Sequence, residues 1–173
     1  MRKLKELKKL FITYKIDGYI IPKNDEFFGE YIPKIKDNLK FISNFSGSYG
    51  FALILKKDNY LFVDGRYTLQ AKLQSGKTFK IVTIPGKSPY NILKNKKLSI
   101  GYDPKLHTDL ILNRLFKKTH CKLIPLNENL INKIWIRKNN NKSNKFYKLN
   151  DKDSGQSSRN KIKNLLKIIK KIK

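Results

Sequence analysis

The chain has 173 residues, 39% of them hydrophobic, and its 39 lysine and arginine residues against 13 acidic residues give a net charge of +26. This length favours one domain with an appendage, and the apolar fraction excludes an intrinsically disordered chain. Because no apolar run approaches the length that a membrane-spanning helix needs, we expect no transmembrane segment, and the single cysteine, Cys121, excludes an internal disulfide and favours a cytoplasmic location.

The positive charge is spread along the whole chain but is densest in the tail. Residues 1–136 carry 26 basic and 11 acidic residues (net +15), whereas residues 137–173 carry 13 and 2 (net +11). Two interpretations remain open: a solvated coat of lysines over every surface, and a dedicated site for a polyanion. We favour the lysine coat, so nucleic acid is not the expected partner.

The first elements predicted in chain order are a helix and a strand. Apolar residues recur at helical spacing among lysines at the start of the chain, which indicates an amphipathic helix. The apolar run Tyr19–Ile21 predicts a strand that stops at Pro22. Residues Glu30 to Phe41 are expected to form an irregular helical segment interrupted by Pro33.

The centre of the chain predicts a hairpin and a corner. Phe51–Leu55 and Tyr60–Val63 are short apolar runs rich in aromatic and branched residues, and the polar turn between them favours antiparallel pairing. Neither run alternates with polar residues, which indicates a sheet covered on both faces. Asp64 is a good N-cap for a helix over Arg66–Ser75, which Gly76 would end.

The segment that follows, as far as Ile136, predicts strands that alternate with helices. Strands are expected at Phe79–Ile84, Leu98–Tyr102 and Cys121–Ile124. Helices are expected from Ser88 to Lys94, from Thr108 or Asp109 onward with Leu110, Ile111, Leu115 and Phe116 on the buried side, and over Leu126–Trp135. This order predicts an α/β fold, a three-layer sandwich with a mixed β-sheet flanked by helices.

The sequence changes character after residue 136. The stretch RKNNNKSNK, residues 137–145, has the composition of a polar linker. A basic helix follows it and carries one apolar stripe formed by Ile162, Leu165, Leu166, Ile169 and Ile172. We therefore expect a domain over residues 1–136 and a separate segment over 137–173.

Two motifs in the centre carry a family resemblance. The segments SNFSGSYG and FVDGRYTLQA resemble, in order and separation, the signature of the N-terminal, creatinase-like domain of aminopeptidase P, the Xaa-Pro aminopeptidase family. The resemblance implies a creatinase N-terminal domain-like fold for residues 1–136. It also implies that residues 137–173 are the truncated start of a second domain, because GQSS at Gly155–Ser158 resembles the step that begins one.

The same resemblance implies a function that does not include catalysis by this chain. In that family of hydrolases, a separate C-terminal domain holds two divalent metal ions, typically manganese, and removes an N-terminal residue that precedes proline. The two histidines here, His107 and His120, have no carboxylates at ligand spacing and are interpreted as surface or capping residues. We expect no catalytic residue, metal ligand or cofactor in this chain, whose role would be assembly and substrate gating. The expected partner is the peptidase catalytic domain or a homologous subunit, with a dimer in the full-length protein.

Asp64, Arg66 and Tyr67 are the candidates for substrate gating. One interpretation is structural: Asp64 caps the helix and Arg66 pairs with a neighbouring group. The other is that this corner faces the catalytic cleft and that the Arg66 guanidinium holds a substrate carboxylate. The loop Ser46–Gly50 is glycine-rich, but it leads into a strand and lacks a P-loop lysine, so we interpret it as a tight connection rather than a phosphate site.

One rival hypothesis comes from another class of protein. The chain could be a stand-alone basic module that binds nucleic acid or an anionic membrane surface through its lysine-rich final helix. Salt-dependent binding that disappears when residues 137–173 are deleted would distinguish it from the peptidase-domain hypothesis.

Overall fold

The computed structural model describes residues 2–137 and 145–172. The chain forms two compact units, residues 1–139 and 140–173, and each is described by itself. The predicted linker at 137–145 lies largely outside the described residues. Within the described ranges, no helix is both long and apolar enough to cross a membrane.

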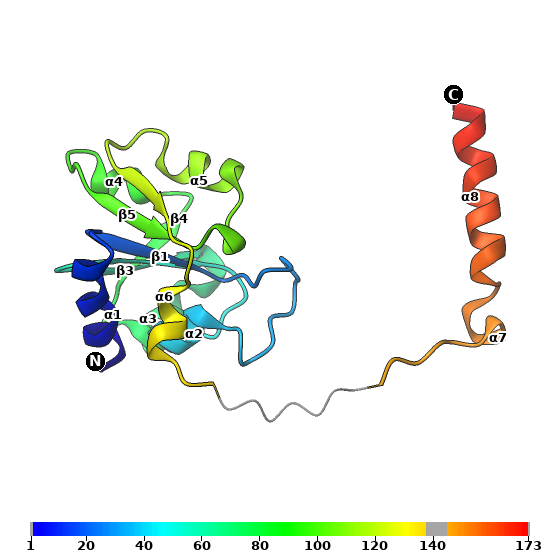
Figure 1. Cartoon of the computed structure of the whole chain (residues 1–173), viewed down its shortest axis with the longest axis horizontal. Coiled ribbons are helices and arrows are strands. Elements are labelled where there is room, and N and C mark those ends of the chain that lie inside the picture. Colours follow the sequence, from blue (N-terminus) through cyan, green and yellow to red (C-terminus); the bar gives the residue numbers. More distant parts are fainter. Residues whose placement is uncertain (1, 138–144, 173) are drawn as a thin grey trace. The chain divides into compact units, whose positions relative to one another are not determined.

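The first unit is built on a six-stranded mixed sheet with the strand order β4-β3-β2-β1-β5-β6 (Figure 1). Strand β2 pairs antiparallel with both β1 and β3, and the outer pairs β3–β4, β1–β5 and β5–β6 are parallel. The strands are β1 (Gly18–Pro22), β2 (Phe51–Leu55), β3 (Asn59–Asp64), β4 (Lys80–Ile84), β5 (Ser99–Tyr102) and β6 (Lys122–Pro125).

The predicted central hairpin is confirmed. Phe51 of β2 lies opposite Phe62 of β3, and their rings stack with centroids 4.5 Å apart. Successive β2 side chains are buried on opposite faces, Leu53 in one hydrophobic cluster and Ile54 in the other. The missing polar alternation in these strands therefore reflects a sheet covered on both sides, as the sequence predicted.

Helices cover the two faces and complete the three layers (Figure 1). Buried residues from α1, α2, α3 and α6 form the core cluster on one face, and those from α4 and α5 form the cluster on the other. The helices of this unit are α1 (Arg2–Thr13), α2 (Asn38–Ser43), α3 (Thr68–Ser75), α4 (Pro89–Leu93), α5 (Asp109–Phe116) and α6 (Leu130–Ile134), with the 3₁₀ turns η1 (Gly65–Tyr67) and η2 (Pro104–Leu106).

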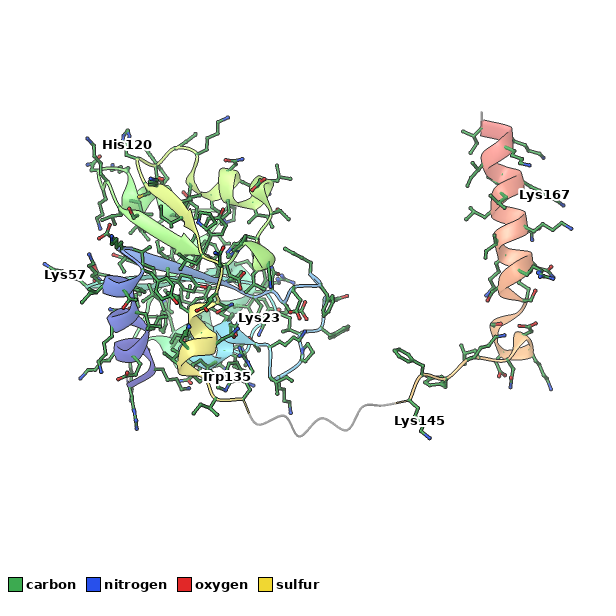
Figure 2. The ribbon with its side chains drawn as sticks, viewed as in Figure 1. Lys23, Lys57, His120, Trp135, Lys145 and Lys167 are labelled. Atoms are coloured by element: carbon green, nitrogen blue, oxygen red, sulfur yellow. The ribbon has the colours of Figure 1, made fainter. Side chains whose placement is uncertain are left out.

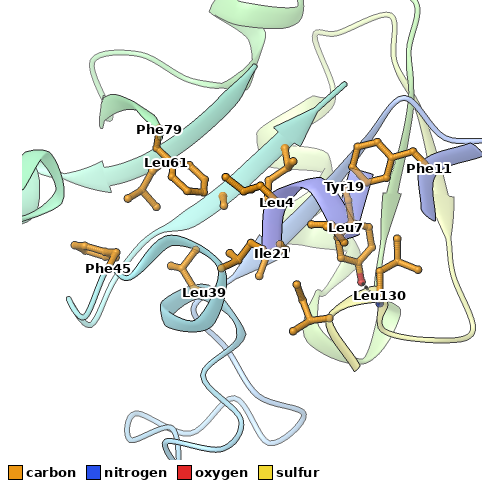
Figure 3. Packing of buried hydrophobic residues seen from close by; sticks show 14 of the residues in the cluster. Leu4, Leu7, Phe11, Tyr19, Ile21, Leu39, Phe45, Leu61, Phe79 and Leu130 are labelled. Atoms are coloured by element: carbon orange, nitrogen blue, oxygen red, sulfur yellow. Dashed lines mark hydrogen bonds between the residues drawn. The ribbon is translucent and has the colours of Figure 1, made fainter. Parts of the chain in front are cut away.

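The larger of the two hydrophobic clusters packs the opening helix α1 against strand β1 and against the closing helix α6. Leu7 and Phe11 of α1 point onto the sheet beside Tyr19, as Figure 3 shows. The backbone N–H of Leu130 donates to the Tyr19 hydroxyl at 3.4 Å, which partners one of the free amides at the start of α6. The amphipathic pattern at the start of the chain thus predicted a helix that supports the core.

Three predicted elements differ from the observed ones. Residues 30–37 form bends and turns, and only α2, from Asn38, is helical, because Gly29 and Pro33 interrupt the preceding segment. The closing helix is limited to α6. The predicted buried side of α5 is wrong in part: Leu112 and Phe116 are buried, whereas Leu110 is 79% exposed.

The side chain of Arg137, at the end of the first unit, forms hydrogen bonds with residues at the start of α2 and just before it. Its Nε donates to the carbonyl of Ile35 at 2.7 Å, and its Nη2 donates to the side-chain oxygen of Asn38 at 2.9 Å. The guanidinium lies 4.5 Å from the ring centre of Trp135 (labelled in Figure 2), which stacks in turn on Phe41. Partial burial lowers the pKa of Arg137, but the group stays charged at neutral pH.

Over its described residues, 145–172, the second unit contains the helices α7 (Asp151–Ser154) and α8 (Ser158–Ile172). The amide of Asn160 donates to the Ser157 hydroxyl at 3.3 Å, so this serine caps α8. No side chain of α8 is buried, and the predicted apolar stripe is exposed along it.

Candidate functional site at the carboxyl edge of the sheet

The predicted gating residues lie at the edge of the sheet where the parallel strands end. Strands β1 and β3 run in the same direction, because each is antiparallel to β2, and β4, β5 and β6 share that direction through their parallel pairing. The carboxyl ends of these strands therefore meet at one edge. In open α/β sheets this edge is where ligand sites are usually found.

Asp64 and Arg66 form a small, closed ion pair at the end of β3. The Arg66 backbone N–H donates to Asp64 Oδ1 at 2.9 Å, which confirms the predicted N-cap. The guanidinium turns back on the same carboxylate, with Nη2 2.7 Å from Oδ2 and Nε 3.2 Å from both oxygens. The cap opens the 3₁₀ turn η1 rather than the predicted helix, and α3 begins at Thr68.

Tyr67 connects this corner to the glycine-rich loop. Its hydroxyl lies 2.7 Å from the Ser48 hydroxyl, and its ring meets buried Phe45 edge-on with centroids 5.8 Å apart. A Cβ at Gly47 would lie 2.3 Å from the Phe45 ring and 2.9 Å from the Tyr67 ring. Only glycine fits between these two rings, so the loop and the corner form one structural unit.

Two glutamines of α3 hold the same loop. The Ser46 backbone N–H donates to Gln74 Oε1 at 2.9 Å, and the Ser46 hydroxyl accepts from Gln70 and Gln74, each at 3.0 Å. Gly50 has φ +154°, and a Cβ there would lie 2.6 Å from the Phe62 carbonyl. The loop amide of Ser46 is thus already partnered, which supports a tight connection rather than a phosphate cradle.

Asp64 orients the positive charge of Arg66, and this charge remains accessible to solvent. The Arg66 side chain is 72% exposed and the Asp64 side chain 22%. The pairing lowers the pKa of Asp64 and raises the pKa of Arg66, in each case chiefly through the side-chain hydrogen bonds between them. An exposed pair of this kind adds little stability. What it provides is an oriented guanidinium at the sheet edge, able to bind a carboxylate.

His107 is expected from the sequence to be a surface or capping residue, and the structure shows it as a cap that is buried. It follows η2 at the same edge as its C-cap residue, and only 8% of it is exposed. Its Nδ1 lies 3.0 Å from the Asp103 carbonyl, and its Nε2 is buried without a partner among the described residues. Burial lowers the pKa of His107. Sequence reasoning missed this burial, because a lone histidine near a helix entry carries no signal for it.

The buried ring of His107 makes stability depend on pH. Its folded-state pKa is below the unfolded value of about 6.5, so the unfolded chain takes up a proton first as the pH falls. We expect the free energy of unfolding to fall below about pH 6.5, with this group contributing at most about 1.4 kcal/mol per pH unit. Urea unfolding from pH 8 to 5 should show this contribution removed in His107→Phe. Equal slopes for both proteins would contradict the burial.

An open hollow lies beside Asp103 on the same edge. Its volume is about 380 Å³, and polar residues between η2 and α6 line it, among them Lys105, Glu128 and Asn129. Asn129 donates to Asp103 Oδ2 at 2.8 Å, so that carboxylate is already partnered. Across residues 2–137 and 145–172, no group of three His, Cys, Asp or Glu side chains is arranged to hold a metal ion.

The fold defines a class: an α/β sandwich domain whose carboxyl edge carries a capped Asp-Gly-Arg-Tyr corner. The profile of the Creatinase/Prolidase N-terminal domain matches residues 3–134. The chain belongs to this family. This confirms the predicted fold and the resemblance inferred from the two central motifs, and it identifies the first unit as a creatinase-like N-terminal domain.

Curated relatives extend well beyond the matched segment. The chain is 32% identical over 181 aligned residues to a probable Xaa-Pro aminopeptidase P of Laccaria bicolor, with 99% of this chain and 28% of that protein covered. It is 32% identical over 176 residues to aminopeptidase P1 of Lotus japonicus, with 95% and 26% covered. The chain therefore spans between a quarter and a third of the length of these relatives.

Solved structures show the same fold. X-prolyl aminopeptidase from Caenorhabditis elegans, described as a cytosolic enzyme with a di-nuclear active site, matches with a TM-score of 0.76 at 23% identity, covering 98% of this chain and 31% of that one. The N-terminal domain of the cytoplasmic peptidase PepQ from Mycobacterium tuberculosis matches with a TM-score of 0.61 at 20% identity, covering 78% and 98%.

Proposed function

We propose that this chain is the non-catalytic N-terminal part of an Xaa-Pro aminopeptidase-like metallopeptidase and serves assembly and substrate gating. The membership of residues 3–134 in the family supports this role, as does the fraction of each relative that the chain covers. The observation that carries the gating proposal is the exposed Arg66 guanidinium, oriented by Asp64 at the carboxyl edge of the sheet. The proposed location is cytoplasmic.

The chemistry of peptide cleavage belongs to a partner in this proposal. A catalytic domain, carried by the longer protein or by a homologous subunit, would hold the two divalent metal ions, and the full-length protein would be a dimer. Within the described ranges, no group of three His, Cys, Asp or Glu side chains is arranged to hold a metal ion. Asp64 is already paired with Arg66, and the Nε2 of His107 is buried.

The gate would act through the positive charge of Arg66 and through the fixed orientation of its guanidinium group. Asp64 engages Nε and Nη2 of Arg66, which fixes the plane of the guanidinium while most of the side chain remains in solvent. An arginine held in this way loses less conformational entropy when it binds an anion. The proposed target is the C-terminal carboxylate of a short Xaa-Pro peptide in the neighbouring cleft.

A chimeric enzyme tests the gate. The segment of the Laccaria bicolor relative that aligns with this chain would be replaced by this chain, and cleavage of Xaa-Pro tripeptides would be measured with manganese. Arg66→Ala should raise KM about ten-fold for tripeptides with a free carboxylate, as expected for one charged hydrogen-bonding contact. Amidated tripeptides should be unaffected. Lys72→Ala, which removes an exposed charge from α3, is the matched control.

The stability of the same variants separates the two roles of the corner. Arg66→Ala keeps the cap, because the capping bond uses the backbone N–H of Arg66. Its melting temperature should therefore remain close to that of the parent, whereas Asp64→Ala loses both cap and pair. If Arg66→Ala lowers the melting temperature while both peptides are cleaved as before, the corner has a structural role only and the gating proposal is wrong.

A further inference from the structure

The loop of residues 24–36, which we call the edge loop, leaves the carboxyl end of β1 and returns to α2 (Figure 1). The two residues that flank it, Lys23 and Asp37, form an ion pair in which each side chain is only 10% exposed. The Lys23 backbone N–H donates to the Gly50 carbonyl at 3.0 Å, at the end of the glycine-rich loop. The edge loop therefore begins at the same edge of the sheet as the corner that carries Arg66.

One residue of the edge loop has a strained backbone. Phe28 has φ +53°, in the left-handed region, which bulky residues rarely adopt. Its N–H donates to the Asp25 carbonyl at 3.2 Å, and the N–H of Phe27 donates to Asp25 Oδ1 at 3.1 Å, so the turn is hydrogen-bonded only locally. A strained residue of this kind persists where surrounding contacts hold the chain. The edge loop therefore needs a restraint beyond its own turn.

The contacts that cross the edge loop are exposed to solvent. Lys36 pairs with Glu26, and its Nζ lies 4.5 Å from the ring centre of Phe27. The side chains of the ion pair are 33% and 42% exposed. Exposed pairs of this kind add little stability, so this contact is a weak restraint on a strained loop.

Arg137 provides a stronger restraint from outside the edge loop. Its Nε donates to the Ile35 carbonyl at 2.7 Å, its Nη1 to Asn132 Oδ1 at 2.6 Å, and its Nη2 to Asn38 Oδ1 at 2.9 Å. Asn38 is only 6% exposed, and the guanidinium also lies over the ring of Trp135. Hydrogen bonds from a charged donor are about twice as strong as neutral ones. Arg137 thus joins the returning end of the edge loop to α6.

We infer that Arg137 is a latch that keeps the edge loop closed. While its guanidinium holds Ile35 and Asn38, the loop keeps the strained conformation of Phe28, and when the guanidinium withdraws, the strain favours an open loop. The first compact unit ends at residue 139, so the chain that leads to the second unit passes through the latch. A change in the path of the chain after Arg137 would therefore act on the edge loop. This device does not depend on the gating proposal.

Hydrogen exchange of the full chain, followed by NMR at single amides, tests the latch. The probes are the hydrogen-bonded amides of Phe27, Phe28 and Lys36. Arg137→Ala should accelerate their exchange at least about ten-fold, as expected for the loss of hydrogen bonds to a charged group, while the amides of β2 and β3 exchange as in the parent. Trp135 is the only tryptophan of the sequence, so acrylamide should quench its fluorescence more strongly in this variant.

Three further variants separate the latch from its surroundings. Lys36→Gln also removes one positive charge at the edge loop, but it should change the exchange less than about two-fold, because its ion pair is exposed. Arg137→Lys keeps the charge and the packing of the stem but loses the planar fork, so it should accelerate exchange even if Arg137→Ala does not fold. Phe28→Asn should slow exchange at Phe27 and Lys36 about three-fold, because asparagine adopts the left-handed region with less strain.

Three results would overturn the inference. Parent-like exchange in the edge loop of either Arg137 variant would mean that the loop is held without the guanidinium. Faster exchange throughout β2 and β3 as well would make Arg137 a general support of the domain rather than a latch. Faster loop exchange in Phe28→Asn would mean that the closed loop stores no strain. The chimera assay stays independent of all three, because it depends on Arg66 and requires a substrate.

Discussion

Replacing Phe45 by alanine should lower the free energy of unfolding by about 3–5 kcal/mol, the usual cost of removing a buried phenylalanine ring. Phe45 is fully buried, and its ring lies against Tyr67 and beneath Gly47. Its loss would leave a cavity and remove the support of the corner that carries Arg66. Urea unfolding followed by near-ultraviolet circular dichroism measures the change.

A neighbouring aromatic provides the control for this prediction. Tyr49 belongs to the same loop but is 54% exposed, so Tyr49→Ala should change the unfolding free energy by no more than about 0.5 kcal/mol. In the chimera, Phe45→Ala should also weaken the discrimination between free and amidated peptides, because the support of Tyr67 is lost. A cost below about 1 kcal/mol for Phe45→Ala would mean that the loop does not rest on this ring.

The sequence predicted the centre of the fold because local and global signals agree there. The runs around Leu53 and Leu61 are apolar on both faces, which only a covered strand accommodates, and the short polar turn permits only a hairpin. Asp64 precedes a corner that needs an N-cap, and the cap is observed. Signals that rest on neighbouring residues and on backbone chemistry could therefore be identified without coordinates.

Other features depend on tertiary contacts that have no local signal. The segment DLILNRLF offers two overlapping apolar stripes, and the sheet buries the one with Leu112 and Phe116 rather than the one with Leu110. The hydrogen bonds that Gln70 and Gln74 donate to the Ser46 hydroxyl connect residues that are 24 and 28 positions apart in the sequence. Ordinary polar residues on an exposed helix face give no indication of such a contact.

Replacing Lys23 by methionine should destabilise the first unit by about 3–5 kcal/mol, the cost of leaving one buried charge without its partner. The ammonium group of Lys23 lies 2.5 Å from Asp37 Oδ2, and both side chains are only 10% exposed. Asp37 also caps α2 by accepting from the Lys40 backbone N–H at 3.0 Å. Methionine keeps the length of the chain and removes the charge, so Asp37 would remain buried with the cap alone.

The exposed pair between Lys56 and Asp17 is the matched control for this substitution. Its side chains are 60% and 31% exposed, so Lys56→Met should cost less than about 1 kcal/mol. Adding Asp37→Asn to Lys23→Met removes the orphaned charge and keeps a capping oxygen, and should recover about half of the loss. Because Lys23 and Asp37 clamp the two ends of the loop between them, Lys23→Met should also increase proteolysis near exposed Phe27. Equal costs for Lys23→Met and Lys56→Met would mean that the first pair is solvated and that the loop is held by other contacts.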